Sequence, residues 1–160
     1  MTEKDLVSIT EEIKTLSLYL DIEKVRFNDD FNYEILADSN VDADNIKIPS
    51  MFLQPFVENA VKHGLLHKAE EKKLKIHFEK VADQIKISID DNGIGRKKSN
   101  ELNQIKNNKH QSFATNAMQN RVNLLNQFTQ KNISIEYIDK QNQNNQSLGT
   151  TVVFVIPIIY

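Results

Sequence analysis

Two segments of this chain constrain its fold more than any others. The first, from Pro49 to about Leu66, reads PSMFLQPFVENAVKHGLL and has the apolar spacing of a helix, with Gly64 near its C-terminal end. Pro55 lies inside this pattern, so it either kinks the helix or marks its true first turn. The second, SIDDNGIG, ends a strand with carboxylates directly before two glycines. We expect the helix and the acidic turn to face each other across one site.

Length and composition narrow the class of protein. A chain of 160 residues is long enough for one domain plus a helix or two. Its apolar content of 39% and charged content of 26% are ordinary for a soluble globular protein, and a net charge of −2 provides no overall attraction to nucleic acid. The absence of cysteine excludes a disulfide framework and a thiolate zinc site. The longest apolar run, TTVVFVIPIIY, is too short to span a bilayer, and the polar, acidic N-terminus predicts no signal peptide.

Apolar periodicity predicts three helices and about five strands. The first helix runs from about Leu6 to Phe27, with Ser8 or Thr10 to Glu12 at its start and with Ile22 and Val25 widening its apolar stripe. The other helices are expected at residues 49–66 and 113–128. Strands are expected at residues 31–36, 74–78, 85–89, 133–137 and 150–156, the second and third as a hairpin and the last buried on both faces. Residues 96–111 and 141–146 form polar loops, and the whole indicates a two-layer α/β sandwich in which a mixed sheet packs on helices.

The helix from residue 49 carries polar side chains that suit a metal–phosphate site. Asn59, Lys62 and His63 follow helical offsets of three and four, which places them on one face. An asparagine carbonyl is a hard neutral oxygen of the kind that Mg²⁺ accepts, and lysine offers a point charge for phosphate oxygens. The alternative is a plain surface helix in which Glu58 and Lys62 form an ion pair worth about 0.3 kcal/mol.

The acidic turn suits recognition of a purine base. A carboxylate such as Asp91 can accept a hydrogen bond from an exocyclic amine, and Gly93 and Gly95 allow positive φ and a close approach of the backbone to a ligand. An ordinary Asn-Gly hairpin turn is the alternative, but the residues after Gly95 do not resume an alternating strand. A calcium loop is excluded, because its first and twelfth positions would be Ser88 and Ser99.

The order and spacing of these motifs resemble the ATP-binding catalytic domain of sensor histidine kinases, within the GHKL superfamily. LQPFVENAVKHG resembles the N box, DDNGIG the first glycine box, and Gly149-Thr150 the last glycine-box element. The branch that it resembles most is the one whose kinases partner response regulators with LytTR domains. EEIKTLSLYLDIEKVRF is similar to a phrase that this branch carries in the second helix of the dimerisation hairpin. The resemblance therefore implies residues 1–28 as that helix and 29–160 as the catalytic domain.

The resemblance implies ATP and Mg²⁺ as ligands and a role for each motif residue. Asn59 would be the Mg²⁺ ligand, Lys62 a phosphate contact, and His63 a neighbour of the ribose or phosphates. Asp91 would bind adenine on a loop shaped by Gly93 and Gly95, and Thr150 would support either Asp91 or a bridging water near the adenine. Residues 96–111 would be the ATP lid, followed by a helix whose N-terminus flanks the phosphates and carries Ser112 and Thr115.

Two departures from the family pattern bear on this interpretation. SFATNAMQNRV stands where the second glycine box usually lies, which leaves the lid contacts open. Pro55 replaces the Glu or Asn that many relatives carry one turn before Asn59, which argues against efficient ATP hydrolysis and suits transfer to a protein side chain.

None of the four histidines suits a phosphoacceptor. His63 belongs to the N box, and His67, His77 and His110 fall on a helix end, a strand and the lid, where surface polarity is the simplest role. We therefore expect the acceptor on an upstream helix, and no self-phosphorylation by this fragment. The family also implies a homodimeric parent anchored in the bacterial membrane, a cytoplasmic catalytic domain, a response regulator as partner, and no direct contact with nucleic acid.

Two other functions stay open at this stage. One is a GHKL serine kinase of the anti-sigma type, which would not need the N-terminal helix stripe and usually has Glu or Asn where Pro55 sits. The other is a degenerate nucleotide-binding module that only transmits conformation, which the altered second glycine box permits.

Overall fold

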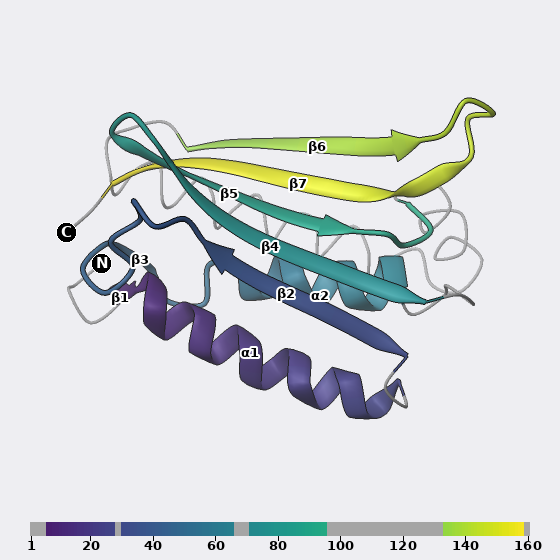
Figure 1. The fold of residues 1–160 in the computed structure, drawn as a ribbon, viewed down its shortest axis with the longest axis horizontal. Coiled ribbons are helices and arrows are strands. Elements are labelled where there is room, and N and C mark those ends of the chain that lie inside the picture. The colour runs from purple at the N-terminus through teal and green to yellow at the C-terminus, as the bar shows by residue number, and fades with distance from the viewer. Residues whose placement is uncertain (1–5, 28–29, 66–70, 96–132, 159–160) are drawn as a thin grey trace, which may run out of the picture.

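The chain forms a mixed five-stranded sheet with helices along one side (Figure 1). This computed structural model describes residues 6–27, 30–65, 71–95 and 133–158. In chain order the elements are β1 (Leu6–Ser8), α1 (Ile9–Arg26), β2 (Phe31–Ala37), β3 (Lys47–Pro49), α2 (Gln54–Asn59), the π-helical turn η2 (Ala60–Leu65), β4 (Lys72–Val81), β5 (Gln84–Asp91), β6 (Ser134–Gln141) and β7 (Ser147–Pro157). The large sheet has the order β2-β4-β5-β7-β6. Its β2–β4 pair is parallel and its other pairs are antiparallel.

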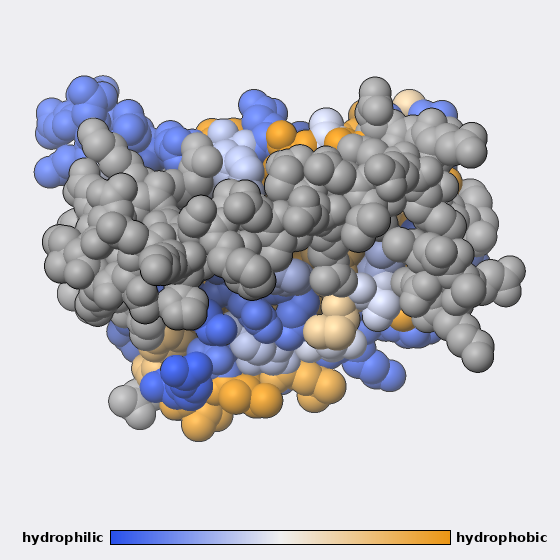
Figure 2. Space-filling view, turned by 180° about the vertical axis from the view of Figure 1, so that it is seen from behind, coloured by the Kyte–Doolittle hydropathy of each residue, from blue (hydrophilic) through white to orange (hydrophobic). Residues whose placement is uncertain are grey.

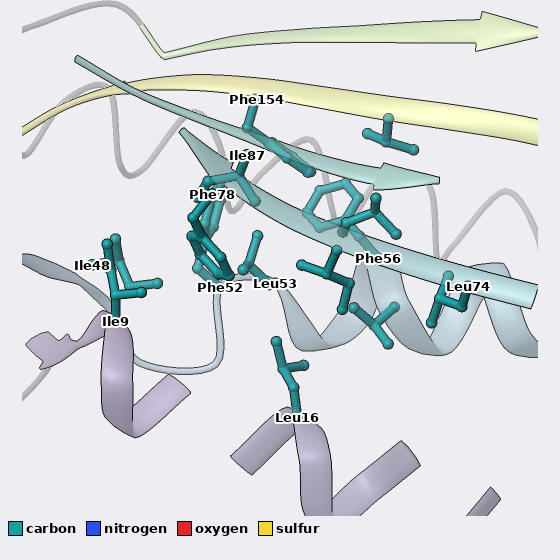
Figure 3. Packing of buried hydrophobic residues seen from close by; sticks show 14 of the residues in the cluster. Ile9, Leu16, Ile48, Phe52, Leu53, Phe56, Leu74, Phe78, Ile87 and Phe154 are labelled. Carbon is teal, nitrogen blue, oxygen red and sulfur yellow. The ribbon is translucent and has the colours of Figure 1, made fainter. Parts of the chain in front are cut away.

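The hydrophobic core lies between the helices and the sheet (Figure 3). The strands alternate as the sequence predicts, so that Ile76 and Phe78 of β4 and Ile87 of β5 are fully buried. Phe154 of β7 joins them and packs its ring edge-on against Phe56 of α2, with the ring centroids 4.7 Å apart. This contact fixes α2 against the strands that end at the acidic turn.

The first helix starts later than the apolar spacing predicted. Leu6–Ser8 form β1, which pairs with β3, and Ser8 caps the helix by accepting a hydrogen bond from the Glu11 N–H at 3.1 Å. Leu16 and Leu20 enter the core, whereas Ile22 and Val25 are 63% and 74% exposed. The predicted widening of the buried stripe is therefore wrong, because those two side chains point to the opposite side of α1.

The second helix also begins later than predicted. Pro49 ends β3, and α2 starts at Gln54 with Pro55 in its first turn. Proline fits there, because the N–H groups of the first turn have no partner within the helix. Of the two roles considered for Pro55, marking the first turn is the one found. From Ala60 the helix continues as the π-helical turn η2, which the sequence pattern did not indicate.

The strand predictions are confirmed, with one correction. The hairpin of β4 and β5 turns at Ala82 and Asp83, and Ala82 adopts a φ of 56°. Strand β7 is not buried on both faces. Val152, Phe154 and Ile156 are buried, while Thr151, Val153 and Val155 on the other face are half-buried. The described helices cover only one side of the sheet, so an unbroken apolar run did not require two covered faces here.

Some predicted elements and boundaries remain predictions. The loop at 96–111 and the helix at 113–128 lie outside the described residues. The boundary at residue 28 is likewise untested, although α1 shares its core with the sheet through Ile9, Leu16 and Leu20. Of the helices in the described ranges, none has the length and apolar character that a membrane span requires.

Candidate nucleotide site

The helix that carries the predicted metal and phosphate ligands is anchored by its apolar side. Phe56, Val57, Val61 and Leu65 are buried, which leaves the polar residues of α2 and η2 toward the margin of the core. Asn59, the last residue of α2, is half-buried, and Lys62 in η2 is exposed. Because a π-helical turn holds more residues than an α-helical turn, Lys62 is rotated away from the position that α-helical offsets from Asn59 predict.

The ion pair that the surface-helix alternative predicts does not form among the described residues. Glu58 Oε1 accepts a hydrogen bond from Gln54 Nε2 at 3.2 Å. A Glu58–Lys62 ion pair is not among those that the described residues form. The change to η2 explains this, because the i,i+4 alignment that such a pair needs is lost there.

Asp91 is a buried carboxylate held in place by the backbone. It ends β5 on the same face as Ile87 and Ile89, which is the face toward the helices, and it is only 5% exposed. Its Oδ1 accepts hydrogen bonds from the Gly93 N–H at 2.8 Å and the Thr150 N–H at 3.3 Å. Among the described residues both bonds go to that one oxygen, so Oδ2 is the atom able to accept from a ligand.

Burial controls the protonation of this carboxyl group. It raises the pKa of Asp91 to about 6, while the bonds from Gly93 and Thr150 and the charge of Lys140 act in the opposite direction. At neutral pH the group is therefore ionised but poorly solvated. Such a carboxylate is a strong acceptor for an amine proton.

Two glycines allow the chain to close around Asp91. Gly95 has a φ of 86°, and a Cβ there would lie 2.1 Å from Ser147 Oγ. Gly149 has a φ of 117°, and a Cβ there would lie 2.0 Å from the Asp91 carbonyl oxygen. Gly93, where positive φ was also expected, contributes its N–H to Asp91 instead. The glycine at 149 thus brings β7 against the turn and places Thr150 next to Asp91.

A second set of contacts at this strand end was not predicted from the sequence. Asp90 Oδ1 accepts from Thr151 Oγ1 at 2.6 Å and pairs with Lys140 Nζ at 2.5 Å. These residues lie on the other face of the sheet and join β5, β7 and β6. Only the strand order brings them together, so no spacing along the sequence could have identified them.

The structure places the predicted elements next to one another. The turn η2 packs against both β5 and β7, the strands that carry Asp91 and Thr150. The helix and the acidic turn thus share one side of the sheet, as expected. The side chain of His63 and all of Ser112 and Thr115 lie outside what the structure describes.

Solved structures with a similar fold are histidine kinase catalytic domains. The mycobacterial sensor histidine kinase MprB superposes with a TM-score of 0.62 at 13% identity, covering 96% of both chains. The catalytic domain of the histidine kinase ThkA gives a TM-score of 0.61 at 14% identity, covering 95% of this chain and 93% of that one. The fold is that of a histidine kinase catalytic domain. This confirms the predicted two-layer architecture.

Sensor kinases are among the sequence relatives of this chain, which confirms the resemblance. The sensor protein LytS of Oceanobacillus iheyensis is 28% identical over 164 residues, which cover 98% of this chain and 26% of that protein. The sensor protein kinase HptS of Staphylococcus aureus is 32% identical over 98 residues, which cover 61% of this chain and 18% of that protein. The chain thus spans about a quarter or less of the length of these two relatives. No protein-family model matches the chain.

Proposed function

We propose that this chain is the ATP-binding catalytic domain of a two-component sensor histidine kinase. It binds ATP and supplies the γ-phosphoryl group to a histidine located outside this sequence. The histidine kinase fold and the sensor-kinase relatives support this assignment. The observation that carries it is Asp91, a buried carboxylate on a glycine turn, whose hydrogen bonds within the described ranges all go to one oxygen, which the backbone holds.

Asp91 would bind the adenine. The exocyclic amine of adenine is a donor, and an ionised carboxylate in a poorly solvated position is the acceptor that best complements it. The turn fixes that carboxylate before the ligand arrives, because Gly93 and Thr150 already hold its Oδ1. Binding therefore requires little reordering of the site.

Asn59 and Lys62 would serve the phosphate end of the nucleotide. The neutral amide oxygen of Asn59, half-buried at the end of α2, fits Mg²⁺, which keeps several waters and takes few protein ligands. When bound, Mg²⁺ would neutralise charge on the phosphate oxygens. Lys62 is exposed and can extend its ammonium group toward them. His63, Ser112 and Thr115 complete the proposed set.

The proposal extends to the parent protein and its partners. The structure that joins ThkA to the response regulator TrrA shows the kind of partner that such a fold has in another kinase. For this chain we propose a response regulator of the LytTR type, a homodimeric parent in the membrane, and an acceptor histidine on an upstream helix.

Calorimetric titration of the chain with a non-hydrolysable ATP analogue and Mg²⁺ tests the nucleotide site. We expect saturable binding that Asp91→Asn weakens at least tenfold, because the amide presents a donor or a weaker acceptor to the adenine amine. Asp83→Asn is the matched control, since Asp83 is exposed in the turn at the other end of β5. Unchanged affinity in Asp91→Asn, or no binding by the wild-type chain, contradicts the assignment.

A further inference from the structure

Asn92, which directly follows Asp91, joins the acidic turn to the start of β4. Its N–H donates to the Lys73 carbonyl oxygen at 3.2 Å, and its Oδ1 accepts from the Lys73 N–H at 2.7 Å. Its Nδ2 donates to the Glu71 carbonyl oxygen at 3.0 Å. Glu71 is itself tied to β2, because its Oε1 accepts from Asn32 Nδ2 at 3.1 Å. The Asn92 side chain thus links the turn to the start of β4, and the Glu71 side chain extends this link to β2.

The Asn92 side chain takes the place of a main-chain group. In an antiparallel ladder, a hydrogen-bonded pair exchanges two N–H···O=C bonds between the same two residues. The last ladder pair of β4 and β5 is Leu74 with Asp91, and the next would be Lys73 with Asn92. There the Lys73 N–H bonds to Asn92 Oδ1 rather than to the Asn92 carbonyl oxygen. The main chain can therefore leave the sheet one residue after Asp91 while the Lys73 N–H keeps a hydrogen-bond acceptor.

This exchange determines the geometry around Asp91. Because the chain turns away at Asn92, the Gly93 N–H returns to Asp91 Oδ1. On the other side the Gly149 backbone lies so close that a Cβ would be 2.8 Å from Asn92 Cα. The turn is therefore held by β4 through Asn92 and by β7 through Gly149.

We propose that Asn92 is a positioning residue that determines the selectivity of this site for adenine over guanine. The inference rests on the proposed nucleotide-binding function and adds a specificity role to it. Adenine presents an amine donor where guanine presents a carbonyl oxygen. A fixed carboxylate at Asp91 accepts from the first and repels the second. Without Asn92 the carboxylate can move away from the guanine oxygen, so discrimination falls.

The test is the ratio of the dissociation constants for GTP and ATP, measured by calorimetry on the full chain. We expect Asn92→Ala to weaken ATP binding about tenfold and to change GTP binding by less than about threefold. Asn45→Ala is the matched control, because the Asn45 side chain bonds only to Asp42 in an exposed turn before β3 among the described residues. It should keep the wild-type ratio. A loss of stability alone would not change the ratio, since both nucleotides bind the same folded state.

A second variant keeps the test decisive if Asn92→Ala does not fold. Asn92→Asp retains the acceptor for the Lys73 N–H and replaces the donor to the Glu71 carbonyl with an oxygen. We expect a smaller drop in the ratio, about threefold, at pH 8. A wild-type ratio in every folded Asn92 variant overturns the inference and leaves the ATP site standing. A wild-type chain that binds GTP as tightly as ATP overturns both the inference and the adenine-binding role of Asp91.

Discussion

Asp91 carries a conflict between stability and binding. The fold buries this carboxylate among apolar side chains. Hydrogen bonds from two backbone N–H groups partly replace the water that the carboxylate loses. Burial still dominates, because the pKa of this group is raised to about 6. The apo protein thus tolerates an unfavourable charge at the position where a ligand amine would relieve it. Buried functional groups in other proteins show the same compromise.

Asp91→Asn should therefore stabilise the apo chain at neutral pH. An aspartate with a pKa near 3.8 when unfolded and about 6 when folded opposes folding in its ionised form. The penalty is absent below pH 3.8, grows as the pH rises, and is fully present above pH 6. By linkage it amounts to roughly 3 kcal/mol at most. Urea unfolding at pH 8 and pH 5 should show a gain that shrinks at pH 5. A variant less stable than wild type at pH 8 would contradict this account of the burial.

Nucleotide binding should weaken as the pH falls through 6. The adenine amine favours the ionised carboxylate, so binding releases the proton from Asp91 whenever it is present. If only the ionised form binds well, affinity at pH 5 should be about tenfold lower than at pH 7.5. Calorimetry with ADP at both pH values measures this. Asp91→Asn is the internal control. The nucleotide phosphates titrate equally with both proteins, whereas the contribution of the residue 91 carboxyl group is absent from the variant. An equal pH dependence in the two proteins would assign it to the phosphates.

The Lys140–Asp90 pair should tune this pH dependence. Lys140 lowers the pKa of Asp91 and Asp90 raises it, and the two are joined directly. Lys140→Met removes the positive charge that favours ionised Asp91 and leaves the negative charge of Asp90, which opposes it. The midpoint of the pH dependence of ADP binding should therefore move upward. Lys80→Met, which removes an exposed lysine of β4, should leave the midpoint unchanged. A downward shift in Lys140→Met would refute this role.

At the scale of elements, periodicity predicted the strands well and the helix boundaries poorly. Residues such as Ile85, Ile87 and Ile89 alternate over a whole strand, and the half-covered sheet reproduces that alternation. The sequence pattern predicts a helix from Pro49, which is too early, because Pro49 and Pro55 are equally plausible first-turn residues in isolation. Pairing of β3 with β1 decides between them, and that pairing depends on tertiary structure.

The same distinction separates the site residues that could be predicted from those that could not. Asp91 and Thr150 stand in short motifs whose chemistry is visible in the sequence. Lys140 and Asn92 acquire their roles only from strand order and register, since Lys140 meets Asp90 across β7 and Asn92 meets Lys73 across the β4–β5 ladder. The change to η2 after Ala60 has no signal in the apolar spacing, so the orientation of Lys62 could not be deduced.

The packing of α2 on β7 makes a prediction at this scale. Phe154 is fully buried and lies edge-on to Phe56 and Phe52, with centroid distances of 4.7 and 5.3 Å. Phe154→Ala should lower the free energy of unfolding by about 3–5 kcal/mol, because it leaves a cavity under the helix that carries Asn59. Leu148→Ala on the same strand is the control, since Leu148 is 48% exposed and should change stability by less than about 1 kcal/mol. Urea denaturation of both variants compares them, and equal losses would mean that this aromatic contact does not hold the two layers together.

At the scale of the whole molecule, α1 has two apolar sides. One enters the core through Ile9, Leu16 and Leu20. The other exposes Leu18, Ile22 and Val25, and hydrophobic surface follows α1 along the lower edge of Figure 2. The helix therefore packs as part of the domain and still presents a hydrophobic surface. The dimerisation-hairpin role that the family resemblance implies for residues 1–28 needs such a surface, and no described residue covers it.

The arrangement of the histidines predicts that the chain does not phosphorylate itself. His77 lies on β4 between the buried residues Ile76 and Phe78, so it points to the sheet face opposite to the helices. Its Nε2 is also engaged by Asp38 Oδ1 at 2.7 Å. His77 is the one histidine whose side chain falls within the described part of the chain, and it does not face the side of the sheet on which the nucleotide is proposed to bind. Phosphoryl transfer needs the nucleophile in line with the γ-phosphate, and a bound nucleotide alone does not provide it.

Incubation with γ-labelled ATP and Mg²⁺ tests this directly. We expect the chain to bind nucleotide with less than a few per cent of acid-labile label per molecule, an order-of-magnitude limit set by misaligned nucleophiles. Joining the chain to the upstream acceptor helix that we propose for the parent should produce labelling, and Asp91→Asn in that longer protein should remove it again. Stoichiometric labelling of the isolated chain would place the acceptor among His63, His67, His77 and His110, and would require the nucleophile to come from the catalytic domain rather than from an upstream helix.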